Sequence, residues 1–171
     1  MLSVFFERWA FWVFVFLFFC LFLFSIFIKK RKSFRYEKIP SLFTKSELKF
    51  LRVLDASVGK EFRVFGKIRI ADVLKPQKGL NKKTWAQNFW RIANKHFDYV
   101  LCDTKTLSPV CAIELNDKSH DRADRKKRDV DVSMICKSAN FPIVWISLSS
   151  SYSQKELRNT ILKEISKTNS R

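Results

Sequence analysis

Two carboxylates and a histidine stand close together around a pair of apolar segments. Glu114 lies at the end of the apolar run PVCAIEL, residues 109–115, and His120 follows it by six residues. Asp98 lies near the start of the preceding apolar run, FDYVLCD, residues 97–103. Carboxylates bind hard divalent cations, and a histidine can transfer a proton near neutral pH. Together these groups suit hydrolysis of a phosphodiester bond.

The two apolar runs are expected to pair as an antiparallel hairpin through the linker TKTLS. If the turn is centred near Thr106, residues whose numbers sum to about 212 stand opposite each other. This register gives three opposed pairs on one face of the sheet: Asp98 with Glu114, Val100 with Ala112, and Cys102 with Val110. Opposed carboxylates about 5 Å apart repel each other unless a cation joins them. Mg²⁺ or Mn²⁺ suits such oxygen ligands, whereas the alternative is a solvated strand end whose acids only increase solubility.

Basic residues crowd the segment after Glu114, and the chain as a whole is strongly basic, with a formal net charge of +17. We expect the crowded residues to contact phosphates: Lys118, Arg122, Arg125, Lys126, Lys127 and Arg128. A charge of this size favours a polyanionic partner, either nucleic acid or an anionic membrane surface. Charge alone does not choose between the two.

The elements that must position these residues follow from hydrophobic period and capping signals. Strands are expected over 61–70, 97–103, 109–115 and 141–148, the last as a strand buried on both faces. Helices are expected over about 45–57, 84–95 and 125–139, and after Ser153. The first and last begin with capping-box patterns, Thr44 with Glu47 and Ser153 with Glu156, and the last is expected to direct Leu157, Ile161 and Ile165 inward. The apolar stripes of the second and third helix are predicted to be Trp85, Phe89 and Ile92, and Val130, Met134 and Ile135. This order predicts an α/β fold with a mixed sheet covered by helices.

The N-terminal part differs in composition from the rest. The stretch from Trp9 to Ile28 holds 20 residues without a charge, a proline or a glycine, enough to cross a bilayer as a helix. The following segment, 29–38, holds six basic residues and one acid. Because basic flanks stay on the cytoplasmic side, we expect a single-pass anchor in the inner, cytoplasmic membrane with the C-terminal domain in the cytoplasm. The basic flank would also contact anionic lipid head groups.

The four cysteines show no spacing typical of a zinc site. A cytoplasmic domain keeps its thiols reduced, so no disulfide partner is expected.

Several of these segments resemble one family. Asp98 in KHFDYVLCD, Glu114 and His120 in AIELNDKSH, and RKKRD followed by FPIVWI look like domain-of-unknown-function family 2726. The upstream segments LFTKSELKFLRVL and VFGKIRIADVL are also similar, so the resemblance runs from about Ile39 to Ser147. The family is placed in the PD-(D/E)XK nuclease superfamily, near the very-short-patch repair endonucleases. The resemblance implies a restriction-endonuclease-like α/β/α fold, Mg²⁺-dependent cleavage of DNA, and a metal site that Glu47 joins.

One position departs from the superfamily pattern. The second residue after the acid is usually lysine there, and aspartate is expected in the family, but here it is Asn116. An amide oxygen can coordinate a metal without adding charge, and Asp117 or Lys118 could compensate. The resemblance suggests that His120 replaces the lysine as the group that activates water. Asn116 therefore puts turnover in question more than fold.

The sequence thus divides into an anchor (1–28), a basic linker (29–38) and a nuclease-like domain (39–171). The leading hypothesis is a membrane-anchored endonuclease-like protein. It would have Asp98, Glu114, His120 and Lys118 as catalytic residues, and Asp98, Glu114, Asn116 and Glu47 as metal ligands. A second hypothesis, favoured by Asn116, is a catalytically impaired module that binds nucleic acid at the membrane. A third is a membrane-associated structural protein whose charge serves only lipid contact.

Overall fold

The computed structural model describes residues 2–27, 34–116 and 123–170. In chain order its elements are α1 (Leu2–Phe27), α2 (Lys45–Val58), β1 (Phe62–Arg69), α3 (Ile70–Val73), α4 (Lys82–Ala93), β2 (His96–Asp103), β3 (Pro109–Asn116), α5 (Ala123–Ser138), β4 (Ile143–Ser147) and α6 (Gln154–Asn169). Two compact units result, one ending at Ile39 and one spanning Pro40–Arg171.

The N-terminal unit contains a single described helix, α1, of 26 residues. Its described side chains from Phe11 to Phe24 are all exposed. Within the described part of the chain, no helix is both long enough and apolar enough to cross a membrane. The membrane-spanning helix therefore stays a prediction from the sequence.

The C-terminal unit is built on a four-stranded sheet in the order β1-β2-β3-β4. β1 pairs antiparallel with β2, β2 pairs antiparallel with β3, and β3 pairs parallel with β4. The predicted mixed α/β sheet is therefore confirmed. Because β3 and β4 run parallel, the chain must cross over between them, and α5 forms that crossover.

The hairpin register is confirmed in its central part. Val100 stands opposite Ala112, as predicted, and continuing that register by two residues places Asp98 opposite Glu114. The predicted pairing of Cys102 with Val110 is wrong, because the register shifts after Leu101 and Cys102 pairs with Pro109. An irregularity of this kind lets one strand hold an extra residue without changing the faces of the residues before it.

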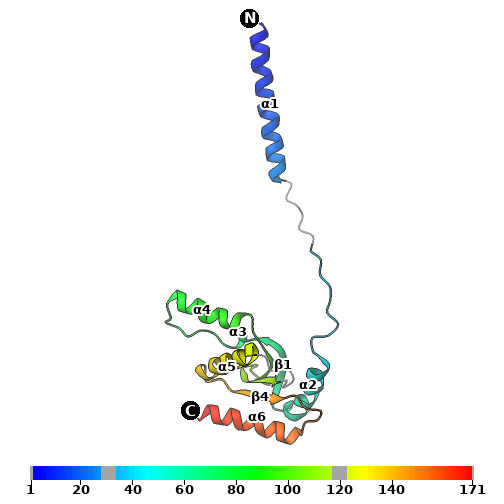
Figure 1. The fold of residues 1–171 in the computed structure, drawn as a ribbon, viewed down its shortest axis with the longest axis vertical. Helices are drawn as coiled ribbons and strands as arrows, with labels where there is room; N and C mark the ends of the chain where they lie inside the picture. The colour runs from blue at the N-terminus through cyan, green and yellow to red at the C-terminus, as the bar shows by residue number, and fades with distance from the viewer. Residues whose placement is uncertain (1, 28–33, 117–122, 171) are drawn as a thin grey trace. The chain divides into compact units, whose positions relative to one another are not determined.

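Two apolar layers hold the sheet between helices. On one face, α2 and α6 bury residues such as Phe50, Leu54 and Ile161 against the sheet. On the other face, α3, α4 and α5 bury Ile70, Ile92 and Val132 against it. Figure 1 shows α5 and α6 on opposite sides of the sheet, with α4 at the periphery.

Two predicted apolar stripes are wrong in part. On α5, Val130 and Met134 are exposed, whereas Val132 and Cys136 are buried. On α4, the buried residues are Ile92 and Ala93 at its last turn. The aromatic residues of α4 contact one another instead of the core: Trp85 stacks on Phe89 with ring centroids 5.2 Å apart, and Phe89 meets Trp90 edge-on at 5.5 Å.

Candidate functional site

Asp98 is held at the start of β2 by partners on both neighbouring strands. Its Oδ2 accepts a hydrogen bond from the backbone N–H of Leu115 on β3, at 3.0 Å. Its Oδ1 accepts one from Lys67 Nζ on β1, also at 3.0 Å. The Asp98 carboxylate therefore lies between β1 and β3, directly beside the residue that follows Glu114.

Glu114 is a buried carboxyl group, with 4 % of its surface exposed. Its Oε1 is buried and has no hydrogen-bond partner within the described part of the chain. Its Oε2 lies 3.9 Å from Arg128 Nη2 on α5. Burying an acid without a partner is costly, so such a group signals either a neutral, protonated form or a missing cation.

The electrostatics of Glu114 agree with this cost. Its pKa is raised from 4.5 to about 8, mainly because burial disfavours the charged form. The negative charge of Asp98 and a side-chain hydrogen bond with Asp98 raise the pKa further, whereas Arg128 acts in the opposite direction. In the absence of a cation, the Glu114 carboxyl is therefore largely protonated at neutral pH.

Lys67 reaches this site from β1, where its backbone has an unusual conformation. It has a φ of 55°, in the left-handed region that a residue with a side chain seldom adopts, although the pairing of β1 with β2 keeps the same register on both sides of it. The preceding residue must be glycine, because a Cβ on Gly66 would lie 2.2 Å from Phe43 Cζ. Continuing the register between β1 and β2 places Lys67 opposite Asp98, so its ammonium reaches that carboxylate across the strand pair and also reaches Glu47.

Besides Asp98, the Lys67 ammonium contacts the carboxylate of Glu47, in the first turn of α2. Its Oε2 accepts a hydrogen bond from the Thr44 backbone N–H, which completes the predicted capping box. Its Oε1 accepts one from Lys67 Nζ at 2.6 Å. One glutamate thus caps its own helix and joins α2 to β1 through the lysine.

The ammonium of Lys67 stabilises the Glu47 carboxylate in its charged form. Burial would raise the pKa of Glu47, but the hydrogen bonds from Lys67 and Thr44 outweigh it, so that pKa is lowered. Burial would likewise lower the pKa of Lys67, yet the hydrogen bonds to Glu47 and Asp98 raise it. Lys67 is therefore a permanent cation at this site and is unsuited to accept a proton.

Asp98 opens onto a surface hollow, which we call the carboxylate hollow. Its lining combines three cationic side chains, Lys67, Lys95 and Arg128, with Asn94, His96 and Asp98. Arg128 Nη2 also donates to the His96 backbone oxygen at 3.5 Å, so α5 and β2 meet at its wall. Each of the three cations also lies 3.9 Å or less from a carboxylate oxygen.

The predicted site residues are only partly brought together. Glu47 and Asp98 share Lys67, and Asp98 lies beside Glu114. Asn116 is exposed and lines a different hollow with Asp129 and Trp145, so its side chain is not placed with Asp98.

The predicted phosphate-contacting residues are also divided. Arg128 reaches the carboxylates, whereas Lys126 and Lys127 are exposed on α5. The side chain of Arg125 is not described. Lys118, His120 and Arg122 lie outside the described residues.

The donor set can be tested for a divalent cation. The described residues contain no group of three or more His, Cys, Asp or Glu side chains arranged to hold a metal ion. Mg²⁺ does not need three, because it is usually bound by one or two carboxylates and keeps waters or substrate phosphates as its other ligands. The unpartnered Oε1 of Glu114 next to Asp98 fits that requirement. A cation there would balance the negative charge of the ionised, buried Glu114 carboxylate.

Lys67 is the residue that reasoning from sequence missed. The segment FRVFGKIR alternates well enough to suggest a plain strand, in which Lys67 would be one solvated charge. The available signal was glycine directly before lysine inside a strand, since such a glycine often accompanies a bulge or a close approach of another group.

Comparison with known proteins adds one finding. The family model described as protein of unknown function, DUF2726, matches residues 39–165. The chain belongs to the DUF2726 family. No curated protein matches the chain, and no solved structure matches it. The resemblance to DUF2726 expected from the sequence is therefore confirmed, and the matched range covers every element of the C-terminal unit except the end of α6.

Proposed function

We propose that this DUF2726 domain is a metal-dependent phosphodiesterase of the restriction-endonuclease-like class that cleaves DNA. The observation that carries the proposal is the buried, unpartnered Glu114 oxygen beside Asp98, at the edge of a cationic hollow. Asp98 and Glu114 would hold Mg²⁺ or Mn²⁺. When bound, the cation would polarise the scissile phosphate and lower the pKa of a bound water.

The chain's own residues take separate roles in this proposal. Lys67 stays charged, so it acts as a fixed cation facing the phosphate, in place of the lysine that the superfamily has where Asn116 stands here. Arg128 and Lys95 line the same hollow and would contact the phosphates on either side. His120, six residues after Glu114 in the sequence, is proposed as the proton-transfer group, and Lys118 as a further phosphate contact.

A cleavage assay with the full-length chain tests the proposal. Supercoiled plasmid and circular single-stranded DNA are incubated with the purified protein in Mg²⁺, in Mn²⁺ and in EDTA. Cleavage should require the metal and should be lost in Asp98→Asn and in Glu114→Gln. The control is Asp55→Asn, which removes an exposed carboxylate from α2 away from the site. Cleavage that persists in Glu114→Gln would contradict the assignment.

One observation favours a second candidate function. The Lys67 ammonium already joins Glu47 to Asp98, which is the position that a cation shared by those two acids would take. A domain built in this way could bind nucleic acid through its cationic hollow without cutting it. It would then retard DNA in a gel shift assay. Addition of Mg²⁺ would not change the stability of the protein and would not lead to cleavage of the DNA.

Attachment to the inner membrane is a separate proposal that rests on the charge-free stretch from Trp9 to Ile28 and on the basic segment after it. The full-length chain should then sediment with membranes and resist extraction by alkaline carbonate. Its C-terminal domain should be cut by protease only when the cytoplasmic face is exposed. Recovery of the chain in the carbonate-soluble fraction would contradict the anchor.

A further inference from the structure

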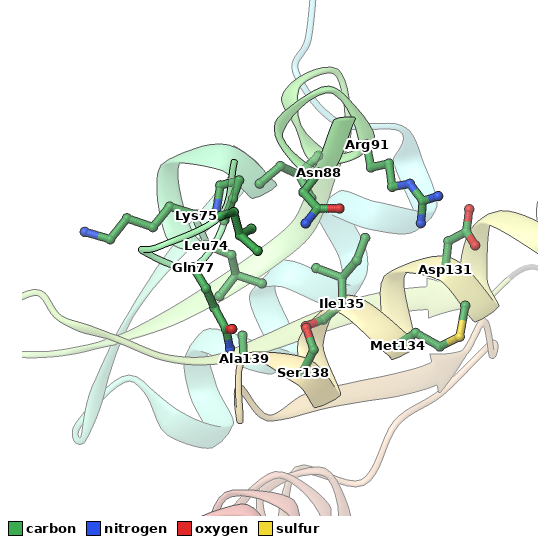
Figure 2. Close-up of a pocket in the computed structure, with 13 residues that line it drawn as sticks. Leu74, Lys75, Gln77, Asn88, Arg91, Asp131, Met134, Ile135, Ser138 and Ala139 are labelled. Carbon is green, nitrogen blue, oxygen red and sulfur yellow. The ribbon is translucent and has the colours of Figure 1, made fainter. Parts of the chain in front are cut away.

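A second cleft lies between α5, α4 and the loop that precedes α4. It has a volume of about 430 Å³, within the range of pockets that hold small ligands, ~300–1,000 Å³. Its apolar lining includes Leu74, Ile92 and Ile135. Figure 2 shows Ile135 of α5 between the two walls that carry Asn88 and Gln77. We call this feature the α4 cleft.

The polar groups at the rim of the α4 cleft are suited to a flat heterocycle. Asn88 and Gln77 carry amides, each of which can both donate and accept a hydrogen bond. Figure 2 shows these amides on opposite walls, above and below the apolar surface, while Lys75 extends away from the cleft. An apolar slot with amides at its rim can hold an unpaired nucleobase, because apolar side chains can cover its faces and amides can bond to its edge.

The charge around the α4 cleft selects a polyanion. From residue 73 to residue 97 the sequence contains no Asp or Glu and six basic residues: Lys75, Lys78, Lys82, Lys83, Arg91 and Lys95. The acid that does line the cleft is Asp131 of α5, and Lys95 Nζ lies 3.8 Å from its Oδ2. The negative charge of Asp131 is therefore opposed by a lysine, and the surroundings of the cleft remain cationic.

The same ion pair joins the α4 cleft to the carboxylate hollow. Asp131 lines the cleft, whereas its partner Lys95 lines the hollow that contains Asp98. Arg91, one turn before Lys95, lines the cleft at the end where Asp131 lies. A strand that placed a base in the cleft could thus pass its phosphates over Arg91 and Lys95 toward Asp98.

We propose that the α4 cleft binds an unpaired nucleotide of a single nucleic-acid strand and holds the strand so that a neighbouring phosphate reaches the carboxylate hollow. This inference rests on the proposed function for the nature of the substrate, and it adds a preference for single-stranded over fully paired DNA. A duplex keeps its bases stacked and paired, so it cannot place one in the cleft without the cost of extruding it.

Binding in the absence of metal tests the α4 cleft independently of cleavage. The full-length chain is titrated in EDTA against a fluorescein-labelled oligothymidylate of 20 nucleotides and against a blunt duplex of the same length, with anisotropy as the readout. The single strand should bind about tenfold more tightly. Ala139→Phe, which places a ring in the cleft from an exposed position, should weaken single-strand binding about tenfold and leave duplex binding within about twofold.

Matched variants make the outcome decisive. Asn159→Phe adds the same ring to an exposed position on α6 and should have no effect. Arg91→Ala should weaken single-strand binding and reduce its salt dependence by about one ion, and Arg91→Lys should recover part of the affinity. Equal affinity for the single strand and the duplex overturns the proposal, as does an Ala139→Phe variant that binds like Asn159→Phe. The proposal is also overturned if thymidine monophosphate competes as strongly as the unlabelled oligonucleotide.

The two proposals can fail separately. If the single strand binds as expected but neither the wild type nor Asp98→Asn cuts DNA, the proposal for the α4 cleft is supported and the proposed hydrolytic function is refuted. If the wild type cuts DNA in Mg²⁺ and Ala139→Phe binds and cuts as the wild type does, the hydrolytic function is supported and the proposal for the α4 cleft is refuted.

Discussion

Lys67 Nζ lies 3.0 Å from Asp98 Oδ1, and the same ammonium lies 2.6 Å from Glu47 Oε1. This contact joins an irregular edge strand, a central strand and the first helix of the domain through one cation. Lys67 adopts a left-handed backbone conformation to make it. Strain of this kind costs free energy and persists where the surroundings enforce it, which is a feature of functional sites.

Lys67→Met should destabilise the domain, because two partly buried carboxylates would lose the cation between them. The expected loss in the free energy of unfolding is about 1–2 kcal/mol, since the lysine is partly exposed and solvent screens part of the interaction. Urea unfolding in EDTA measures it. Lys163→Met, at an exposed position on α6, is the matched control. Equal midpoints for the two variants would show that the contact contributes nothing.

The same variant separates the two candidate functions. If Lys67 occupies the place of a metal, Mg²⁺ should raise the urea midpoint of Lys67→Met and leave the wild type unchanged. If Asp98 and Glu114 bind the metal while Lys67 faces the phosphate, Mg²⁺ should stabilise both proteins and neither should respond once Glu114→Gln is added. A ligand that binds only the folded state raises stability with its concentration, so the comparison needs no substrate.

The stability of the metal-free protein should fall as pH rises from about 5 to about 8, because of Glu114. Its pKa in the fold is about 8 and its ordinary value is 4.5, so between these values the folded state holds a proton that the unfolded chain has lost. The contribution is fully present below the lower value and is lost as pH rises through the upper one, with a slope of at most about 1.4 kcal/mol per pH unit. Urea unfolding in EDTA across this range should show the fall.

Glu114→Gln should remove this part of the pH dependence, since an amide does not titrate. Glu37→Gln, which changes an exposed carboxylate in the other unit, should keep it. An unchanged slope in Glu114→Gln would show that the Glu114 carboxyl group is not the source of the pH dependence.

Local signals were sufficient for most of the fold. Thr44 and Glu47 form the capping box that their spacing predicts, and Leu157 and Ile161 point inward at helical spacing. The hairpin register follows from the linker and from the alternation around Val100. Each of these features depends on neighbours in the sequence, which is why the sequence alone predicts it.

Features that depend on packing between distant segments were missed or mistaken. α5 has apolar residues on more than one face. Packing against the sheet decides that Cys136 is buried and Met134 is exposed. β4 looks like a central strand in sequence but lies at the edge of the sheet, with Val144 as its buried residue. The contact between Lys67 and Asp98 depends on how β1 pairs with β2 and on the left-handed backbone of Lys67, which no period in the sequence reveals.

Gly66→Ala should displace Phe43 and weaken the site that depends on it. The added Cβ would lie 2.2 Å from Phe43 Cζ and 2.8 Å from its Cε1, and the ring cannot retreat freely because it stacks on Tyr99 with centroids 5.7 Å apart. Overpacking of this kind costs about 1–3 kcal/mol. Phe43→Ala removes the obstacle, so the glycine substitution should cost less in that background. Urea unfolding of the four proteins in a double-mutant cycle measures the coupling, and strict additivity would place the cost elsewhere.

The three thiols of the C-terminal unit should be inert in the folded protein. Burial raises the pKa of Cys111 and of Cys136 to about 12 and raises that of Cys102 as well, and the thiolate is the form that reacts. In a Cys20→Ser variant, which removes the exposed thiol of α1, Ellman's reagent should therefore find no fast-reacting group in buffer and three in denaturing urea. A thiol that reacts within minutes in buffer would mean that one of the two apolar layers opens, and replacing each cysteine in turn would identify which. Since Cys111 belongs to the layer beneath α2 and α6 and Cys136 to the layer beneath α5, their relative rates at intermediate urea would show which face of the sheet unfolds first.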